Sequence, residues 1–166
     1  MGQLLTVDVA RTWRAEQATA GRSVVFTNGV FDLLHVGHVR YLQAARALGD
    51  ALVVGLNSDV SAAALKPGRP LVPQAERAEV LAALACVDAV VIFDGTEANE
   101  LVGALRPDVY VKGGDWGLAG GKQPPEAAVA ASYGGRIAYL PYVAGHSTSA
   151  LIERIAAAAG GKQTAR

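Results

Sequence analysis

SVVFTNGVFDLLHVGHVRYLQAARALG, residues 23–49, places a short β-branched run, a glycine turn and a helical pattern in direct succession. Residues 23–27 are typical of a buried strand, and the apolar residues after His38 recur at the spacing of one helix face until Gly49. The turn between them holds two of the chain's three histidines, His35 and His38. A helix N-terminus that follows such a turn attracts anions. The pattern therefore predicts a phosphate site here.

The same alternation of short strands and longer helices continues along the chain. Alternation of this kind favours an α/β fold with a parallel sheet, in which ligands bind beyond the carboxyl ends of the strands. We expect one domain over residues 1–166. Residues 6–19 could form a preceding helix, which gives a helical extension over 1–20, and residues 160–166 are expected to form a tail. The expected strands are residues 23–27, 51–56, 88–93, 108–111 and 136–140.

The composition narrows the class of protein. With 166 residues, 51% of them hydrophobic, the chain is long enough and apolar enough for one packed core. The formal net charge is zero, which gives no reason to expect nucleic acid as a partner, and no apolar run is long enough to span a membrane. The N-terminus lacks the features of a signal peptide, and the one cysteine, Cys86, excludes an intrachain disulfide. We therefore expect a cytoplasmic protein.

The two histidines of the first turn are suited to phosphate. One helical turn presents His35 and His38 on the same side, and Gly37 between them lets a phosphate approach the backbone closely. Both imidazoles can donate hydrogen bonds to oxygens whose charge grows in a transition state. A zinc site would need more ligands at suitable spacing than three histidines and one cysteine supply. A helix cap beside a partly buried histidine remains the alternative.

Three further segments carry candidate binding residues. GHSTS, residues 145–149, offers hydroxyls that can cap the last helix and bind phosphate, although a cap without a ligand fits the local pattern equally well. Lys66 lies in a loop stiffened by prolines, and KGGD, residues 112–115, follows the fourth expected strand. Asp32 and Asp59 are acids that could orient a magnesium-bound triphosphate or a sugar hydroxyl.

Seven stretches, in this order and at these spacings, resemble the cytidylyltransferase-like nucleotidyltransferase superfamily. The similarity is strongest to its branch that acts on D-glycero-β-D-manno-heptose 1-phosphate. The chain departs from that branch at Trp116, where tyrosine is common, and over residues 117–127. The matching stretches are TNGVFDLLHVGHVRYLQAARALGDALVVGLNSD, LKPGRPL, ERAEVLAAL, VDAVVIF, RPDVYVKGGDW, YGGRI and GHSTSALIERI.

The resemblance implies a Rossmann-like fold with a five-stranded parallel sheet and helices on both faces. It also implies transfer of AMP from ATP to the sugar 1-phosphate, which gives ADP-heptose and pyrophosphate, with Mg²⁺ carried mainly by the nucleotide. The residues expected to be catalytic are His35, His38 and Lys66. Those expected to bind the nucleotide are Thr27, Asn28, Gly29, Phe31, Asp32, Gly37, Lys112, Gly113, Gly114, Asp115, Ser147, Thr148 and Ser149. Those expected to bind the substrate are Asp59, Arg69, Arg77 and Trp116.

Two other functions stay open at this point. One is a cytidylyltransferase for a polyol phosphate such as glycerol 3-phosphate, because backbone groups could read the base. The other is a non-catalytic nucleotide-binding domain, since a fold does not fix a function. The expected partners are ATP and a sugar phosphate, without nucleic acid or membrane. The oligomeric state is open, with a homodimer as one candidate.

Overall fold

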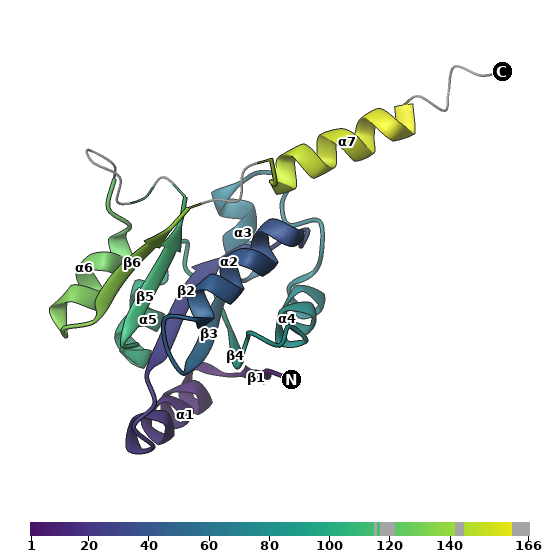
Figure 1. The fold of residues 1–166 in the computed structure, drawn as a ribbon. Helices are drawn as coiled ribbons and strands as arrows, with labels where there is room; N and C mark the ends of the chain where they lie inside the picture. Colours follow the sequence, from purple (N-terminus) through teal and green to yellow (C-terminus); the bar gives the residue numbers. More distant parts are fainter. Residues whose placement is uncertain (115, 117–121, 142–144, 161–166) are drawn as a thin grey trace.

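The computed structural model describes residues 1–114, 116, 122–141 and 145–160. Within these residues, six strands form one parallel sheet in the order β1-β4-β3-β2-β5-β6, and helices cover both of its faces (Figure 1). The strands are β1 (Gln3–Leu5), β2 (Val24–Gly29), β3 (Ala51–Asn57), β4 (Ala89–Phe93), β5 (Val109–Gly113) and β6 (Arg136–Leu140). The helices are α1 (Val7–Thr19), α2 (Val36–Arg46), α3 (Asp59–Leu65), α4 (Gln74–Ala82), α5 (Asn99–Leu105), α6 (Pro125–Ser132) and α7 (Thr148–Gly160).

The expectation of five strands is wrong, because β1 adds a sixth at one edge of the described sheet. Gln3 pairs with Ala89 of β4, and the two strands run parallel. Three residues are too few to show an alternating pattern, and Leu4 is 55% exposed although it lies in a strand. The α/β class, the parallel sheet and the helices on both faces are as predicted.

Packing on the two sides of the sheet follows the alternation of side chains along each strand. On β2, Val25 points into a cluster with Leu42 of α2 and Leu81 of α4. Its neighbour Phe26 points into the opposite cluster, with Leu101 of α5. Because β2 is buried from both sides, its first half, Val24–Phe26, is a continuous apolar run rather than an alternating one.

The strand order reverses beside β2, which places the ligand-binding edge. From β2 the chain moves to β3 and β4 on one side, then returns to add β5 and β6 on the other. Parallel sheets of this kind bind ligands at the carboxyl ends of the strands that flank such a reversal. Here these ends carry Asn28 and Gly29 on β2 and Lys112 and Gly113 on β5.

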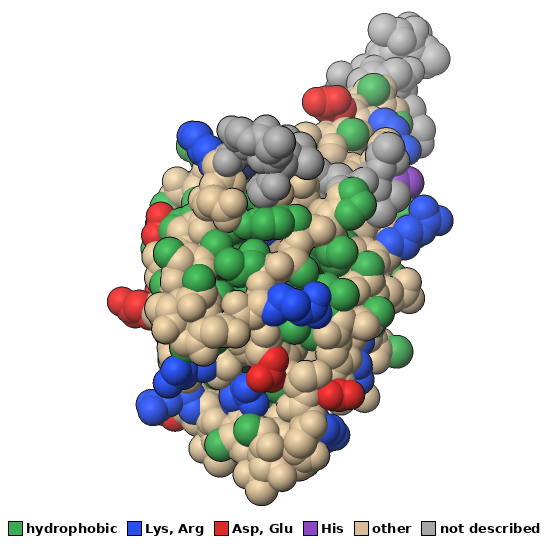
Figure 2. All heavy atoms as spheres, turned by 60° about the vertical axis from the view of Figure 1, so that its left-hand side comes forward, with side chains coloured by type: hydrophobic (Ala, Val, Ile, Leu, Met, Phe, Trp, Pro, Cys, Tyr) green, Lys and Arg blue, Asp and Glu red, His purple; other side chains and the backbone are tan. Residues whose placement is uncertain are grey.

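Two surfaces lie away from this edge. Helix α7 extends outward from the body of the molecule, and Ile155 on it is 56% exposed (Figure 1). Figure 2 shows the side near β6 and α6, where hydrophobic side chains gather in the middle of the face and acidic ones lie around them. No helix in the described part of the chain combines the length and the hydropathy needed to cross a membrane.

Candidate active site

A cavity of about 630 Å³ opens at the reversal point of the sheet, between the starts of α2 and α7. This volume is within the range of pockets that hold small-molecule ligands. Four separate segments meet there, namely the turn after β2, the first turns of α2, the end of β5 and the start of α7. The described residues that line the cavity are Asn28, Gly29, Val30, Phe31, His35, Gly37, His38, Tyr41, Lys112, Gly113, Trp116, Gly145, His146, Ser147, Thr148 and Ala150.

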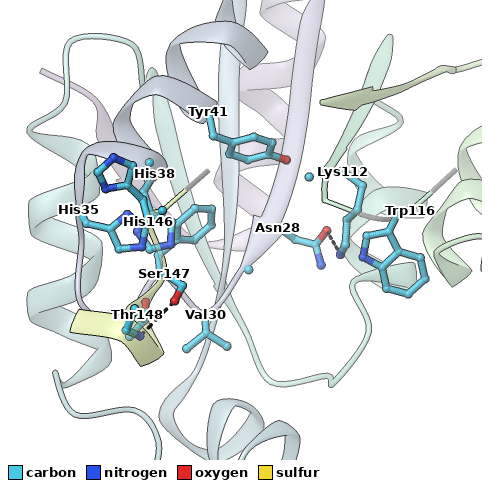
Figure 3. A pocket seen from close by; sticks show the side chains of 16 residues that line it. Asn28, Val30, His35, His38, Tyr41, Lys112, Trp116, His146, Ser147 and Thr148 are labelled. Atoms are coloured by element: carbon cyan, nitrogen blue, oxygen red, sulfur yellow. Dashed lines mark hydrogen bonds between the residues drawn. The ribbon is translucent and has the colours of Figure 1, made fainter. Parts of the chain in front are cut away.

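One side of the cavity is formed by the three histidines (Figure 3). The rings of His35 and His38 are stacked with their centroids 3.9 Å apart, and the ring of His146 lies 6.3 Å from that of His35. Gly37 permits this arrangement. A Cβ atom at Gly37 would lie 2.9 Å from the His35 ring and 3.0 Å from the His146 Cβ. The glycine therefore lets two distant turns of the chain come together.

The imidazoles of His35 and His38 are held neutral and incompletely hydrogen-bonded. Burial, together with the nearby His35, lowers the pKa of His38 to about 4. Burial and the nearby His146 also lower the pKa of His35. The Nδ1 atoms of His35 and His38 are buried without a hydrogen-bond partner. Buried polar atoms of this kind are rare in folded proteins, and a ligand that supplies oxygen atoms would satisfy them.

The opposite side of the cavity carries Lys112, Asn28 and Trp116 (Figure 3). The Nζ of Lys112 donates a hydrogen bond to Asn28 Oδ1 at 3.0 Å and lies 5.9 Å from the centre of the Trp116 ring. Among the described lining residues, Lys112 is the only lysine or arginine. The cavity therefore has a side lined by histidines and a side with one amine.

Tyr41 lines the cavity between these two sides, and its hydroxyl contacts Thr27, which lies outside the lining. Their hydroxyl groups lie 2.7 Å apart, and Thr27 is fully buried. The Tyr41 ring packs against Gly113, where a Cβ would come within 3.0 Å of it. Tyr41 is not among the residues predicted from the sequence, although it lies one helical turn after His38 and so on the same face of α2.

The start of α7 brings hydroxyl groups and a lysine to the histidine side. Ser147 caps this helix, because its Oγ accepts a hydrogen bond from the Ala150 amide at 3.1 Å. The Nζ of Lys66 donates to Ser149 Oγ at 3.2 Å, across 83 positions of the chain. Lys66 is outside the cavity lining but adjoins the turn that forms it.

Asp32 holds the loop that carries Lys66. Its carboxylate accepts hydrogen bonds from Arg69 Nη1 at 2.7 Å and from the amides of Leu71 and Val72 at 2.8 and 3.0 Å. Burial raises the pKa of Asp32, but these hydrogen bonds outweigh it, and the pKa falls below its usual value. Neither Asp32 nor Arg69 lines the cavity, so the contacts that they make are internal.

Arg77 is also directed into the protein rather than into the cavity. It is 1% exposed, and it donates hydrogen bonds to the carbonyls of Val30, Val72 and Asn57 and to the carboxylate of Asp59. These contacts fix the ends of β2 and β3 relative to α4. The predicted contact of Arg77 and Asp59 with substrate stays a prediction, and the structure gives both residues a bracing role.

The structure thus brings together only part of the predicted site. Asp115 lies outside the described residues. The roles assigned to all of these side chains remain predictions. The predicted residues that line the cavity are Asn28, Gly29, Phe31, His35, Gly37, His38, Lys112, Gly113, Trp116, Ser147 and Thr148. Those that do not line it are Thr27, Asp32, Asp59, Lys66, Arg69, Arg77, Gly114 and Ser149.

The donor atoms around the cavity suit an anion better than a directly bound metal. In the described part of the chain, no group of three or more His, Cys, Asp or Glu side chains is placed to hold a metal ion. The described lining contains no aspartate or glutamate, the side chains that magnesium prefers. Imidazole, amine, amide and hydroxyl groups instead offer hydrogens to oxygen atoms.

Comparisons with known proteins agree on one family. The family described as cytidylyltransferase-like matches residues 26–154. The bifunctional protein HldE of Syntrophotalea carbinolica is 56% identical over 140 residues, which cover 81% of this chain and 27% of that protein. The bifunctional protein HldE of Geobacter sulfurreducens is 52% identical over 157 residues, which cover 93% of this chain and 31% of that protein. The chain thus spans less than a third of the length of these relatives.

A solved structure supports the same fold. The lipopolysaccharide core biosynthesis protein from Thermoplasma volcanium GSS1 is 27% identical and superposes with a TM-score of 0.59. The match covers 74% of this chain and 98% of that protein.

Proposed function

The chain belongs to the cytidylyltransferase-like family, and on that basis we propose that it transfers the adenylyl group of ATP to D-glycero-β-D-manno-heptose 1-phosphate. An oxygen of the sugar phosphate attacks the α-phosphorus of ATP, the bond from that phosphorus to the bridging oxygen breaks, and pyrophosphate leaves. The products are ADP-heptose and pyrophosphate. The attacking phosphate is already ionised at neutral pH, so no general base is required. Catalysis then consists of positioning and of stabilising charge.

The observation that carries this proposal is the pair of unpartnered Nδ1 atoms on His35 and His38, two residues that line the cavity. The imidazoles are neutral near pH 7, so they act as hydrogen-bond donors to the triphosphate rather than as fixed charges. Donors that are aimed at a developing charge typically contribute about 10²–10³ each to the rate. The helix dipole of α7 and its Ser147 and Thr148 hydroxyls favour an anion on the same side.

Positive charge for the triphosphate comes from two sources in this proposal. Lys66 adjoins the turn through Ser149 and is exposed, so its amine can move onto the phosphates when ATP binds. We expect magnesium to enter the site with the nucleotide and to be carried mainly by triphosphate oxygens, since the described lining offers it no carboxylate. Bound there, it would neutralise charge on the departing pyrophosphate.

Three findings support the heptose phosphate as acceptor. The relatives that are about half identical are bifunctional proteins named HldE, and the Thermoplasma protein is named for lipopolysaccharide core biosynthesis. The motifs KGGD, residues 112–115, and GHSTS, residues 145–149, also resemble the heptose branch more closely than the polyol branch. The size of the cavity accommodates a sugar phosphate beside a nucleotide.

Pyrophosphate release is the measurement that tests this proposal. Each of the four ribonucleoside triphosphates is combined with D-glycero-β-D-manno-heptose 1-phosphate and, separately, with glycerol 3-phosphate. ATP with the heptose phosphate is expected to give the highest kcat/KM. A higher value for CTP with glycerol 3-phosphate would replace the proposal with a polyol-phosphate cytidylyltransferase. Nucleotide binding without any pyrophosphate release would indicate a non-catalytic domain.

A further inference from the structure

A buried carboxylate beneath the cavity has no part in the function described so far. Glu126 lies in the first turn of α6 and is 2% exposed. Its Oε1 accepts hydrogen bonds from Asn28 Nδ2 at 3.1 Å and from the Ala98 amide at 3.0 Å. Its Oε2 accepts a hydrogen bond from the Tyr110 hydroxyl at 3.1 Å. Moving a carboxylate out of water is costly, and these hydrogen bonds offset part of that cost.

The contacts of Glu126 lead to the amine side of the cavity. Lys112 Nζ lies 3.9 Å from Glu126 Oε1, and its side chain is only 18% exposed. Asn28 connects the two, because its Nδ2 donates to Glu126 while its Oδ1 accepts from Lys112. The amide is therefore fixed in one orientation. The Lys112 amine donates one hydrogen to Asn28, so its other hydrogens remain available to a ligand in the cavity.

Charge within this network is balanced by Glu126. Burial lowers the pKa of Lys112, and the Glu126 carboxylate opposes that effect. Burial raises the pKa of Glu126, but Lys112 and the hydrogen bond from Ala98 outweigh it, so the group stays ionised. Burial and the same carboxylate raise the pKa of Tyr110, which remains a donor. The phenols of Tyr41 and Tyr139 are the other titratable groups that face the Tyr110 hydroxyl.

The arrangement of the cavity bears on which ligand the Lys112 amine binds. Two phosphate groups must meet in the reaction, and each needs its own donors. The histidines and the start of α7 lie together on one side (Figure 3), and Lys66 joins that side through Ser149, so these groups account for the triphosphate. Lys112 lies across the cavity and is the only lysine or arginine of the described lining.

We propose that Glu126 is a positioning residue that holds the Lys112 amine and the Asn28 amide toward the cavity, so that Lys112 binds the phosphate of the acceptor substrate. Glu126 itself is buried below both side chains and acts through them. The acceptor is a sugar phosphate, so this inference rests on the proposed function. It adds a residue from the segment over which the chain departs from the heptose branch, residues 117–127.

Glu126→Gln is the first test, because it keeps the shape of the side chain and removes its charge. The KM for the acceptor is expected to rise about tenfold or more, the scale for losing support of a charged hydrogen bond, while the KM for ATP stays close to wild type. The alkaline limb of kcat/KM for the acceptor should move to lower pH, since Lys112 loses its counter-ion. Equal changes in both KM values with an unshifted pH profile would overturn the proposal.

Two variants serve as comparisons for this test. Glu79→Gln removes an exposed acid from α4 and should leave both KM values and the pH profile unchanged. Glu126→Asp keeps the charge but withdraws the carboxylate, so the acceptor KM should rise without the pH shift. If Glu126→Gln does not fold, Glu126→Asp alone decides: an unchanged acceptor KM in that variant would overturn the proposal.

A second measurement is independent of the reaction. In protein labelled with ¹³C-lysine, the side-chain signal of Lys112 is assigned by its loss in Lys112→Ala and followed through a pH titration. Its titration should move to lower pH in Glu126→Gln and stay in place in Glu79→Gln. An unmoved Lys112 titration would overturn the proposal whatever the enzyme assay shows. A moved titration in a protein that releases no pyrophosphate with any substrate pair would instead refute the proposed function.

Discussion

Replacement of Gly37 by alanine is the sharpest test of the histidine side. The new Cβ would stand 2.9 Å from the His35 ring and 3.0 Å from the His146 Cβ. Carbon atoms in contact prefer a separation of about 3.5–4.0 Å, so the two obstructing groups must move by roughly 0.5–1 Å. Both belong to side chains at the cavity rather than to the core. We expect the fold to survive and the site to open.

The size of the effect follows from that displacement. A misplacement of about 1 Å near the reacting atoms can lower the rate by about 10²-fold. Stability should change little, because alanine inside a helix is favoured over glycine by roughly 0.5–1 kcal/mol, which offsets part of the strain. Gly37→Ala should therefore lose about 10² in kcat/KM and keep a melting temperature close to wild type.

The assay is pyrophosphate release with ATP and the heptose phosphate, beside thermal unfolding of the same samples. Gly103→Ala is the matched control, because its Cβ would meet only Val129, at an ordinary 3.7 Å. That variant, inside α5, should keep full activity and gain a little stability. Wild-type kcat/KM in Gly37→Ala would refute the reasoning. A melting temperature that falls with the activity would assign Gly37 to folding instead.

Three other outcomes are expected. His38→Gln should lower turnover by about 10²–10³. It should also flatten the pH dependence of the free energy of unfolding. The pKa of His38 is about 4 in the folded protein against 6.5 in the unfolded chain, so its contribution to that free energy is fully present above pH 6.5 and is lost as the pH falls toward 4. Denaturant unfolding across that range checks this, and an unchanged slope would contradict it. Lys66→Ala should reduce turnover strongly with little change in melting temperature, because the side chain is exposed; parallel losses would mean a structural role. Arg77→Met should lower the free energy of unfolding by about 3–5 kcal/mol, since three backbone carbonyls and Asp59 lose a buried donor, and chemical denaturation that shows less than 1 kcal/mol would contradict the bracing role.

The part of the fold that sequence predicts well is the part with strong local signals. Strand β2, its glycine turn and α2 follow from an apolar run, from glycine and from helical spacing within 27 residues. Strand β1 has no such signal, because three edge residues gain their structure only by pairing with β4. Its existence depends on a contact between residues more than 80 positions apart, which no local pattern records.

The candidate site divides in the same way. The histidine turns were predictable, since His, Gly and hydroxyl residues at helix starts are unusual in a chain so rich in alanine. Arg77 carries the same charge as a ligand-binding arginine, and only its burial shows that it braces the protein. Glu126 lies in the segment over which the chain departs from the heptose branch, and its contacts appear only where α6 meets β2, across 98 positions.

The two sides of the cavity differ in how firmly the protein holds them, and this difference suits the reaction. Lys112 and Asn28 are fixed from below by the buried carboxylate of Glu126, so the amine side is set before any ligand arrives. The histidine side depends on α7, which extends away from the body of the molecule and meets it near its first turn (Figure 1). In the described part of the chain, the contacts between the start of α7 and the body of the molecule include the Lys66–Ser149 hydrogen bond and the stacking of His146 near His35. Elements with few buried contacts open at low free-energy cost. We therefore expect the triphosphate to order the start of α7 on binding, with the acceptor phosphate meeting a side that is already formed. Hydrogen exchange should slow in α7 when ATP binds and stay unchanged at the end of β5; the reverse pattern would contradict this division.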